Sequence, residues 1–100
     1  MTILARTEQG AIEISEAALS QLVLRAAGQV EGGRVRRPRR GLHVDVADGR
    51  ATVSLELAAR RGVLLPDLAL EIQESVAGAL ERMCEVEVAA VDVSIEKIES

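Results

Sequence analysis

Three polar residues in the middle of the chain are of the types that acid–base and nucleophilic chemistry requires. His43 is the only histidine, Ser54 falls opposite it if the two stretches form a hairpin, and Glu56 lies diagonal to it. A histidine beside a carboxylate can act as a general base. These side chains would stand on an open sheet face, and a flat surface makes no pocket. We therefore interpret His43 as a solvated strand residue and predict no catalytic residues and no enzymatic activity.

Cys84, the only cysteine, is predicted to be structural. Its neighbours Glu81 and Glu85 and its place at a helix end disfavour the reactive thiolate. A single cysteine allows no disulfide within the chain, which fits a reducing compartment. One histidine and one distant cysteine make no metal-ligand pattern, so no metal and no cofactor are predicted. Gly32-Gly33 follows a helix instead of leading into one, unlike a phosphate-binding loop.

The clearest candidate for binding is the arginine segment, which is Arg34–Arg40 with the sequence RVRRPRR. Its five arginines are Arg34, Arg36, Arg37, Arg39 and Arg40. Guanidinium groups bind phosphates, anionic lipid headgroups or an acidic protein surface. Pro38 and the repulsion between like charges favour a loop. The sequence therefore predicts a basic interaction loop.

Two other interpretations of the arginine segment stay open. It is equally consistent with a solvated loop that only connects two elements. It could also dock onto the acidic helix face of a second copy, formed by Glu71, Glu74 and Glu81. Such a contact is heterologous and can propagate into a chain or filament.

The composition excludes several classes of function. The chain has no Phe, Tyr or Trp, so it cannot stack bases on aromatic rings or form an aromatic cage. A length of 100 residues with 48% hydrophobic residues suits one folded domain. Outside the arginine segment, 7 basic residues face 16 acidic ones. Because this acidic body repels phosphate, a small nucleic-acid-binding module that uses Arg34–Arg40 is the second interpretation.

The elements that position these residues are clearest between Gly41 and Val76. Asp48-Gly49 suits a two-residue type I′ turn, which pairs Ala47 with Arg50 and Val44 with Val53. That register gathers apolar residues on one strand face, namely Leu42, Val44, Val46, Ala51, Val53, Leu55 and Leu57. A helix begins near Pro66, and its predicted buried stripe is Leu68, Ile72, Val76, Ala79, Leu80 and Met83.

The other predicted elements are a strand at 10–14, a helix from 15 toward 32, and a last strand at 86–98 with a bulge near Ala89-Ala90. The order β-α-β-β-α-β predicts an α+β fold with two helices on one face of a four-stranded, mostly antiparallel sheet. Residues 1–9 are predicted to be a flexible N-terminal tail, and residues 10–100 a single domain.

Short motifs in a fixed order give the chain a family resemblance. They are Gly10-x-Ile12-x-Ile14-Ser15, Val30-x-Gly32, Gly41-Leu42-x-Val44, Asp48-Gly49, Gly62-Val63-x-x-Pro66, Ile72-Gln73-x-x-Val76 and Val86-x-Val88-x-x-Val91-x-Val93. In this order and spacing the chain resembles the bacterial alkaline shock protein family, small cytosolic proteins linked to cell-envelope stress. Gly33, Arg61 and Cys84-Glu85 depart from the family pattern.

The resemblance implies a non-enzymatic protein of envelope stress and homeostasis. Family members self-associate and are held near the membrane by a separate membrane-embedded protein, so the expected partners are the chain itself and a membrane-anchored protein. No catalytic residue and no small-molecule substrate come with the resemblance. The chain shows no signal peptide and no apolar run that could span a membrane. We therefore expect a cytoplasmic protein, peripheral at the inner face of the cell membrane through its partner.

Overall fold

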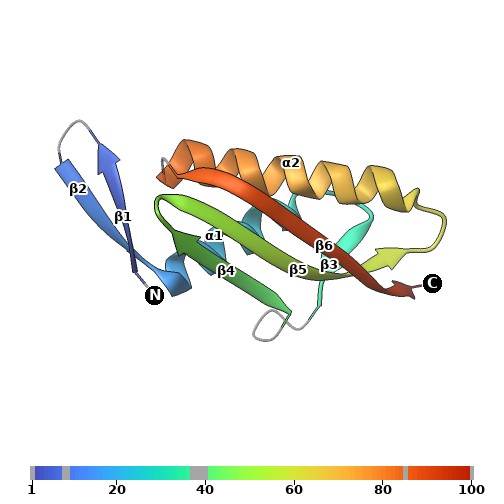
Figure 1. Cartoon of the computed structure of the whole chain (residues 1–100). Coiled ribbons are helices and arrows are strands. Elements are labelled where there is room, and N and C mark those ends of the chain that lie inside the picture. The colour runs from blue at the N-terminus through green and yellow to red at the C-terminus, as the bar shows by residue number, and fades with distance from the viewer. Residues whose placement is uncertain (1, 8–9, 37–40, 85, 100) are drawn as a thin grey trace.

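A computed structural model describes residues 2–7, 10–36, 41–84 and 86–99, with side chains from Ala17 onward. Figure 1 shows a main sheet with a long helix beside it and a separate hairpin at one end. The elements are β1 (Thr2–Thr7), β2 (Gly10–Ser15), α1 (Glu16–Gly28), β3 (Gly33–Val35), β4 (Leu42–Ala47), β5 (Arg50–Arg60), α2 (Leu65–Cys84) and β6 (Glu87–Glu99).

The central hairpin, β4 and β5, forms as predicted. Asp48 and Gly49 have φ angles of 53° and 75°, which is the left-handed backbone that a type I′ turn needs at both positions. The register pairs Ala47 with Arg50 and Val44 with Val53. Of the apolar face, all residues are buried except the partly buried Val46. Turn chemistry and hydrophobic alternation therefore act together to specify this register.

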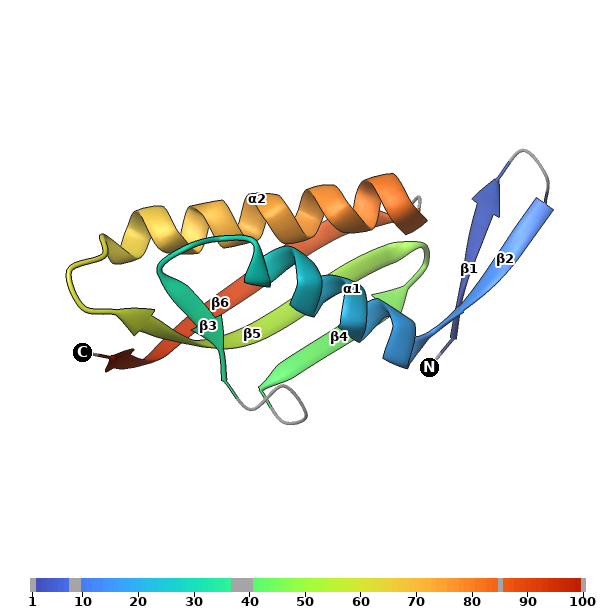
Figure 2. The same ribbon diagram turned by 180° about the vertical axis from the view of Figure 1, so that it is seen from behind.

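The main sheet is built around β5. Both β3 and β4 pair antiparallel with β5 and lie end to end along one of its edges. Strand β6 pairs parallel with β5 along the other edge. Both helices lie on the same side of this sheet, as the two opposite views show (Figures 1 and 2). The predicted α+β class is confirmed: two helices cover one face of four strands, and two of the three strand pairings are antiparallel.

The segments that supply the strands differ from the prediction. Residues 10–15 do form a strand, but β2 pairs with β1 in a separate hairpin and not with the main sheet. The fourth strand of the sheet is β3, within the segment that we expected to be a loop. Gly32 has a φ of 98° and lets the chain reverse after α1. Its carbonyl then accepts a hydrogen bond from the Arg60 amide at 2.7 Å, which aligns β3 with β5.

Residues Thr2–Thr7 form β1, where no element was predicted. Ile3, Leu4 and Ala5 are its apolar residues, and it pairs with β2 along its whole length. The division into a tail of residues 1–9 and a domain of residues 10–100 stays a prediction.

The core lies between the helices and the sheet. Residues Leu19, Leu55, Leu57, Leu68 and Leu80 are at most 2% exposed, and burial of each such side chain contributes about 1.5–3 kcal/mol. The Ser75 hydroxyl of α2 donates a 2.8 Å hydrogen bond to the Ala26 carbonyl of α1 and ties the two helices together.

The predicted stripe of α2 is confirmed except at its last member. Leu68, Ile72, Val76, Ala79 and Leu80 are buried, whereas Met83 is 67% exposed. Cys84 is buried instead, at 3%. Met83 lies in the last turn, where α2 reaches the end of the core. The periodicity of the helix therefore does not predict the burial of Met83 correctly.

Strand β6 contains two irregularities in its pairing with β5. The register shifts so that Ala51 and Thr52 of β5 face Val88 and Ala90, which leaves Ala89 as an extra residue. The bulge predicted near Ala89-Ala90 is therefore confirmed. A second shift, between Leu57 and Ala58, was not predicted.

Candidate interaction site

The arginine segment begins on β3 and continues into residues that the structure does not describe. Arg34 is the middle residue of β3, and Arg36 follows the strand directly. Arg37, Arg39 and Arg40 lie outside the described residues. The two ends of the loop meet at one residue of β5: the Arg36 amide donates to the Glu56 carbonyl at 2.8 Å, and the Glu56 amide donates to the Gly41 carbonyl at 2.9 Å. The loop thus begins and ends at a fixed point on the sheet edge.

Gly41 is required at this point because nothing larger fits. A Cβ atom added there would lie 2.7 Å from the Arg36 carbonyl oxygen and 2.9 Å from Oε2 of Glu56. Both distances are far below van der Waals contact, and the first involves rigid backbone. The close approach of two backbone segments therefore selects glycine.

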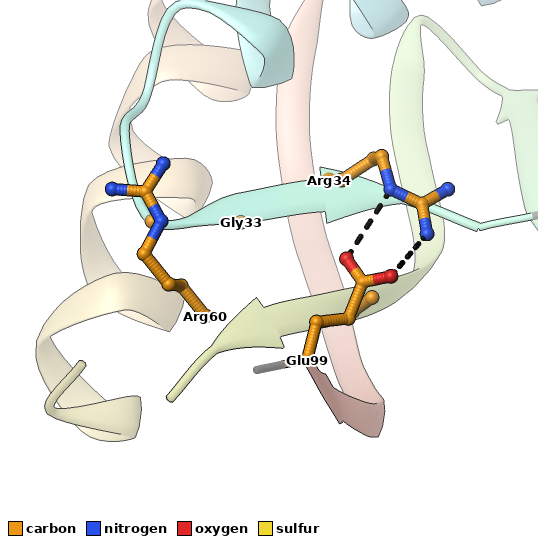
Figure 3. A pocket seen from close by; sticks show the side chains of 6 residues that line it. Gly33, Arg34, Arg60 and Glu99 are labelled. Atoms are coloured by element: carbon orange, nitrogen blue, oxygen red, sulfur yellow. Dashed lines mark hydrogen bonds and ion pairs between the residues drawn. The ribbon is translucent and has the colours of Figure 1, made fainter. Parts of the chain in front are cut away.

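Arg34 reaches across β5 to the last described residue of β6. Its Nη2 lies 2.7 Å from Oε2 of Glu99, and its Nε donates to Oε1 at 3.4 Å (Figure 3). The hydrogen bond and the attraction between opposite charges raise the pKa of Arg34. The same hydrogen bond lowers the pKa of Glu99, and the charges of Arg34, Lys97 and Arg36 add to the effect. Both side chains face solvent, so this pair gives little stability but orients Arg34.

A shallow hollow lies beside this ion pair on the sheet face without helices. Its volume is about 230 Å³, and it is lined by Gly32, Gly33, Arg34, Ala58, Arg60 and Glu99. Ala58 is paired with Arg34 in the sheet and is only 1% exposed. Its methyl group therefore forms part of the floor. Arg60 and Arg34 stand on opposite sides of Gly33 in Figure 3.

Two cations outside the arginine segment, Arg60 and Lys97, lie near the Arg34–Glu99 ion pair. Arg60 pairs with Glu99 in the sheet register, and Lys97 pairs with Ala58. Sequence reasoning missed Arg60 and Lys97, since they are far from Arg34 along the chain. The one usable signal was strand alternation, which puts Arg60 two residues beyond Ala58 on the same face. We call Arg34, Arg36, Arg60 and Lys97 the basic end.

The acidic helix face forms at another place on the same chain. Glu71, Glu74 and Glu81 of α2 are all exposed. Asp67 is in the first turn, where an acid complements the helix dipole. One chain thus carries both a basic end and an acidic helix face.

The polar residues of the central hairpin lie on an exposed strand face. His43 and Ser54 are directly paired across β4 and β5, as expected, and both are exposed. Burial raises the pKa of the Cys84 thiol, which keeps it protonated and unreactive. Within residues 17–36, 41–84 and 86–99, no three His, Cys, Asp or Glu side chains come close enough to hold a metal ion.

Fold and site together define a class of protein, a small α+β domain with two helices on one face of a four-stranded sheet and a cluster of cations at one end of that sheet. The model of the alkaline shock protein 23 family, described as having a cell envelope-related function, matches residues 33–100. The chain belongs to this family. The match starts at β3 and includes the arginine segment, the hairpin, α2 and β6. No curated protein matches the chain.

Solved structures share the fold at low sequence identity. The nickel form of a MamM CTD variant is 21% identical, with a TM-score of 0.57, and the match covers 83% of this chain and 99% of the other. The cadmium form of another variant is 23% identical, with a TM-score of 0.57 and coverage of 83% and 96%. At this identity the likeness concerns the fold alone. No helix in the described part of the chain is long and apolar enough to cross a membrane.

Proposed function

We propose that this chain is a non-enzymatic module of the cell envelope that associates with itself and is recruited to the inner membrane surface by a membrane-anchored protein. The observation that carries the proposal is the separation of charge on one chain. The basic end lies at one end of the sheet, whereas Glu71, Glu74 and Glu81 are exposed on α2. Membership in a family with a cell envelope-related function supports the same conclusion.

Charge separation of this kind favours contact between unlike surfaces of two copies. The arginine segment of one copy would lie against the acidic helix face of the next, which is a heterologous contact. Each exposed ion pair contributes about 0.2–1 kcal/mol, so several must form together. Such an interface weakens as salt rises, because the Debye length is only about 8 Å at physiological ionic strength.

Sedimentation velocity at low and physiological salt tests the arginine segment. A variant with Arg37, Arg39 and Arg40→Ala is compared with wild type, and Arg34 is kept because it holds Glu99. We expect the variant to sediment as smaller species than wild type at low salt. A matched control removes three arginines elsewhere, Arg25, Arg50 and Arg82→Ala, and should associate as wild type does. An equal loss of association in both variants would show that net charge, not this segment, drives association. Wild-type association of the Arg37, Arg39 and Arg40→Ala variant would contradict a role for the segment.

Recruitment to the membrane is tested separately by capture from solubilised membranes. The wild-type chain should retain one integral membrane protein. Comparison of its recovery with the Arg37, Arg39 and Arg40→Ala variant and with the charge-matched control then shows whether the arginine segment is the surface that binds it. Recovery of cytosolic proteins alone would contradict the proposed recruitment, even if self-association is observed.

A second candidate is a nucleic-acid-binding module, favoured by one observation. Arg34, Arg36, Arg60 and Lys97 gather on one end of the sheet, and the sequence adds three further arginines directly after Arg36. If five arginines met phosphates, the log–log salt slope of binding would be about −4. Titration with RNA at two salt concentrations distinguishes the candidates. Tight binding with this slope supports the second, whereas weak binding at both concentrations supports the first.

A further inference from the structure

The N-terminal hairpin, formed by β1 and β2, is not part of the main sheet. Strand β1 pairs only with β2 among the described strands. Figures 1 and 2 both show this hairpin projecting from one end of the molecule, which is 47 Å long but only 22 and 19 Å in the other directions. A two-stranded hairpin alone is marginally stable in water. It therefore needs further pairing or an apolar surface.

The register of the hairpin pairs apolar residue types at alternate positions of β1 and β2. Ile3 is paired with Ile14, and Ala5 with Ile12. Because alternate residues of a strand share a face, these four positions fall together. The positions between them are mostly polar: Thr2, Leu4 and Arg6 on β1, and Ala11, Glu13 and Ser15 on β2.

The main sheet has an edge that could accept a further strand, namely the outer edge of β6. Strand β6 is 13 residues long and pairs only with β5 among the described strands. The Gln73 side chain donates to the Val91 carbonyl at 2.9 Å and so covers one point of the outer edge. Beyond Val91, the structure shows no described strand against this edge. An uncovered edge is a template for another strand.

A groove between α2 and β6 runs beside this edge. Ala77, Val88 and Val91 contribute its apolar surface, and Glu74 and Asp92 its acidic rim. Leu70 of α2 is 54% exposed and lies on the same helix face as Glu74 and Ala77. The edge thus combines free backbone, apolar surface and negative charge.

The hairpin cannot reach this edge in its own chain. Strand β2 ends at Ser15 and α1 begins at Glu16, so no linker lets the hairpin turn back. Helix α1 packs near β3 and β4, which lie on the edge of β5 opposite β6. The hairpin is therefore joined to the molecule through α1, on the side of β5 opposite the free edge of β6.

The charge of β6 favours pairing with β1 of a second copy over pairing with β6 of that copy. Strand β6 carries Glu87, Asp92, Glu96 and Glu99 against one Lys97. Two β6 strands side by side would bring acidic residues opposite one another, which is unfavourable. Strand β1 contains Arg6 and no acidic residue, and its outer edge is not paired with any described strand.

We propose that β1 of one copy adds to the free edge of β6 in a second copy, so that the hairpin acts as an exchanged arm. This inference rests on the proposed self-association and names a second surface for it. Each chain carries one donor arm and one acceptor edge. The contact is therefore heterologous, and it closes into a ring or continues as an open chain.

Two proline substitutions at paired positions test the arm. In an antiparallel hairpin, the backbone groups of alternate residues point to the outer edge. Thr7 and Gly10 are the last pair before the turn of the hairpin, with two residues between them. In a hairpin with a two-residue turn, this last pair is hydrogen-bonded. Leu4 and Glu13 then form a non-hydrogen-bonded pair, so their amides point outward. Leu4→Pro removes a donor from the outer edge of β1, and Glu13→Pro removes one from the outer edge of β2.

Sedimentation equilibrium of the full-length variants supplies the readout. We expect Leu4→Pro to raise the dissociation constant by about tenfold or more, since it removes a ladder hydrogen bond and blocks close approach. Glu13→Pro should associate as wild type does. Association of Leu4→Pro at wild-type strength would overturn the proposal, and so would an equal loss in both variants, since the effect would not then belong to the β1 edge.

Cross-linking gives an independent check of the acceptor. Arg6→Cys and Glu96→Cys chains, mixed in equal amounts and oxidised, should form a disulfide-linked heterodimer. Arg6→Cys mixed with Asp45→Cys, which lies on β4, should not. Equal yields in both mixtures would contradict pairing with β6. A wild-type chain that is monomeric at all concentrations would refute the proposed self-association itself, whereas wild-type assembly without these effects would refute only the arm.

Discussion

Gly41 is the residue at which a single added methyl group should have the largest and most informative effect. It closes the arginine segment against β5, and its backbone is buried. A Cβ atom in Gly41→Ala would lie 2.7 Å from the Arg36 carbonyl and 3.0 Å from Cβ of Glu56. The Glu56 carboxylate can rotate away, but the carbonyl can move only if β3 and β4 separate. Overpacking of this kind costs about 1–3 kcal/mol.

The expected loss is large enough to measure in a domain of this size. One kcal/mol shifts the melting temperature of a 60–100-residue domain by about 4–8 °C, so Gly41→Ala should melt roughly 10 °C lower. Chemical denaturation should show a lower midpoint with an unchanged slope, because the surface exposed on unfolding is the same.

Gly28→Ala is the matched control. Gly28 is the last residue of α1, and an added Cβ meets nothing within 4 Å. Alanine favours a helix over glycine by about 0.5–1 kcal/mol, so this variant should be as stable as wild type or slightly more so. Equal stability of Gly41→Ala and wild type would refute the close approach at the loop. Equal destabilisation of both variants would show that glycine matters here for another reason.

Three further predictions concern single side chains. Because Arg34 lowers the pKa of Glu99, this pair stabilises the fold above the pKa of an unfolded glutamate, and the contribution is lost as pH falls through the lower folded pKa. Titration of Glu99 by NMR should show a depressed pKa that returns toward the ordinary value in Arg34→Ala; an unchanged value would argue against the ion pair. Met83→Ala should leave the free energy of unfolding nearly unchanged, since that side chain is 67% exposed, whereas Leu80→Ala should lose about 2–5 kcal/mol in denaturant titration; similar losses would place Met83 in the core. Cys84 should react with iodoacetamide only after unfolding, because it is 3% exposed and burial raises its pKa, and rapid reaction of the native protein would contradict both.

The basic end shows where sequence reasoning was sufficient and where it was not. Arg34 and Arg36 were predicted as binding candidates because they stand in a run of arginines. Arg60 and Lys97 were missed, since only the pairing of β3 and β6 with β5 brings them beside Arg34. The ion pair with Glu99 joins residues 65 positions apart, and no local pattern indicates it.

Strand β3 was missed for a related reason. Three residues are too few to show alternation, and Pro38 with its charged neighbours suggested a loop. Its pairing depends on the Arg60 amide and the Glu56 carbonyl of β5, which lie far from β3 along the chain. Tertiary context therefore overrode local composition.

The sequence by itself determined the central hairpin, the stripe of α2, the bulge of β6 and the family, because each depends on residues that are close along the chain. Only the tertiary structure decided which segments complete the sheet, which cations surround the hollow, and which edges stay unpaired. The physical reason is that strand pairing is a contact between distant segments. Its partners are chosen by packing over the whole core and not by any one strand.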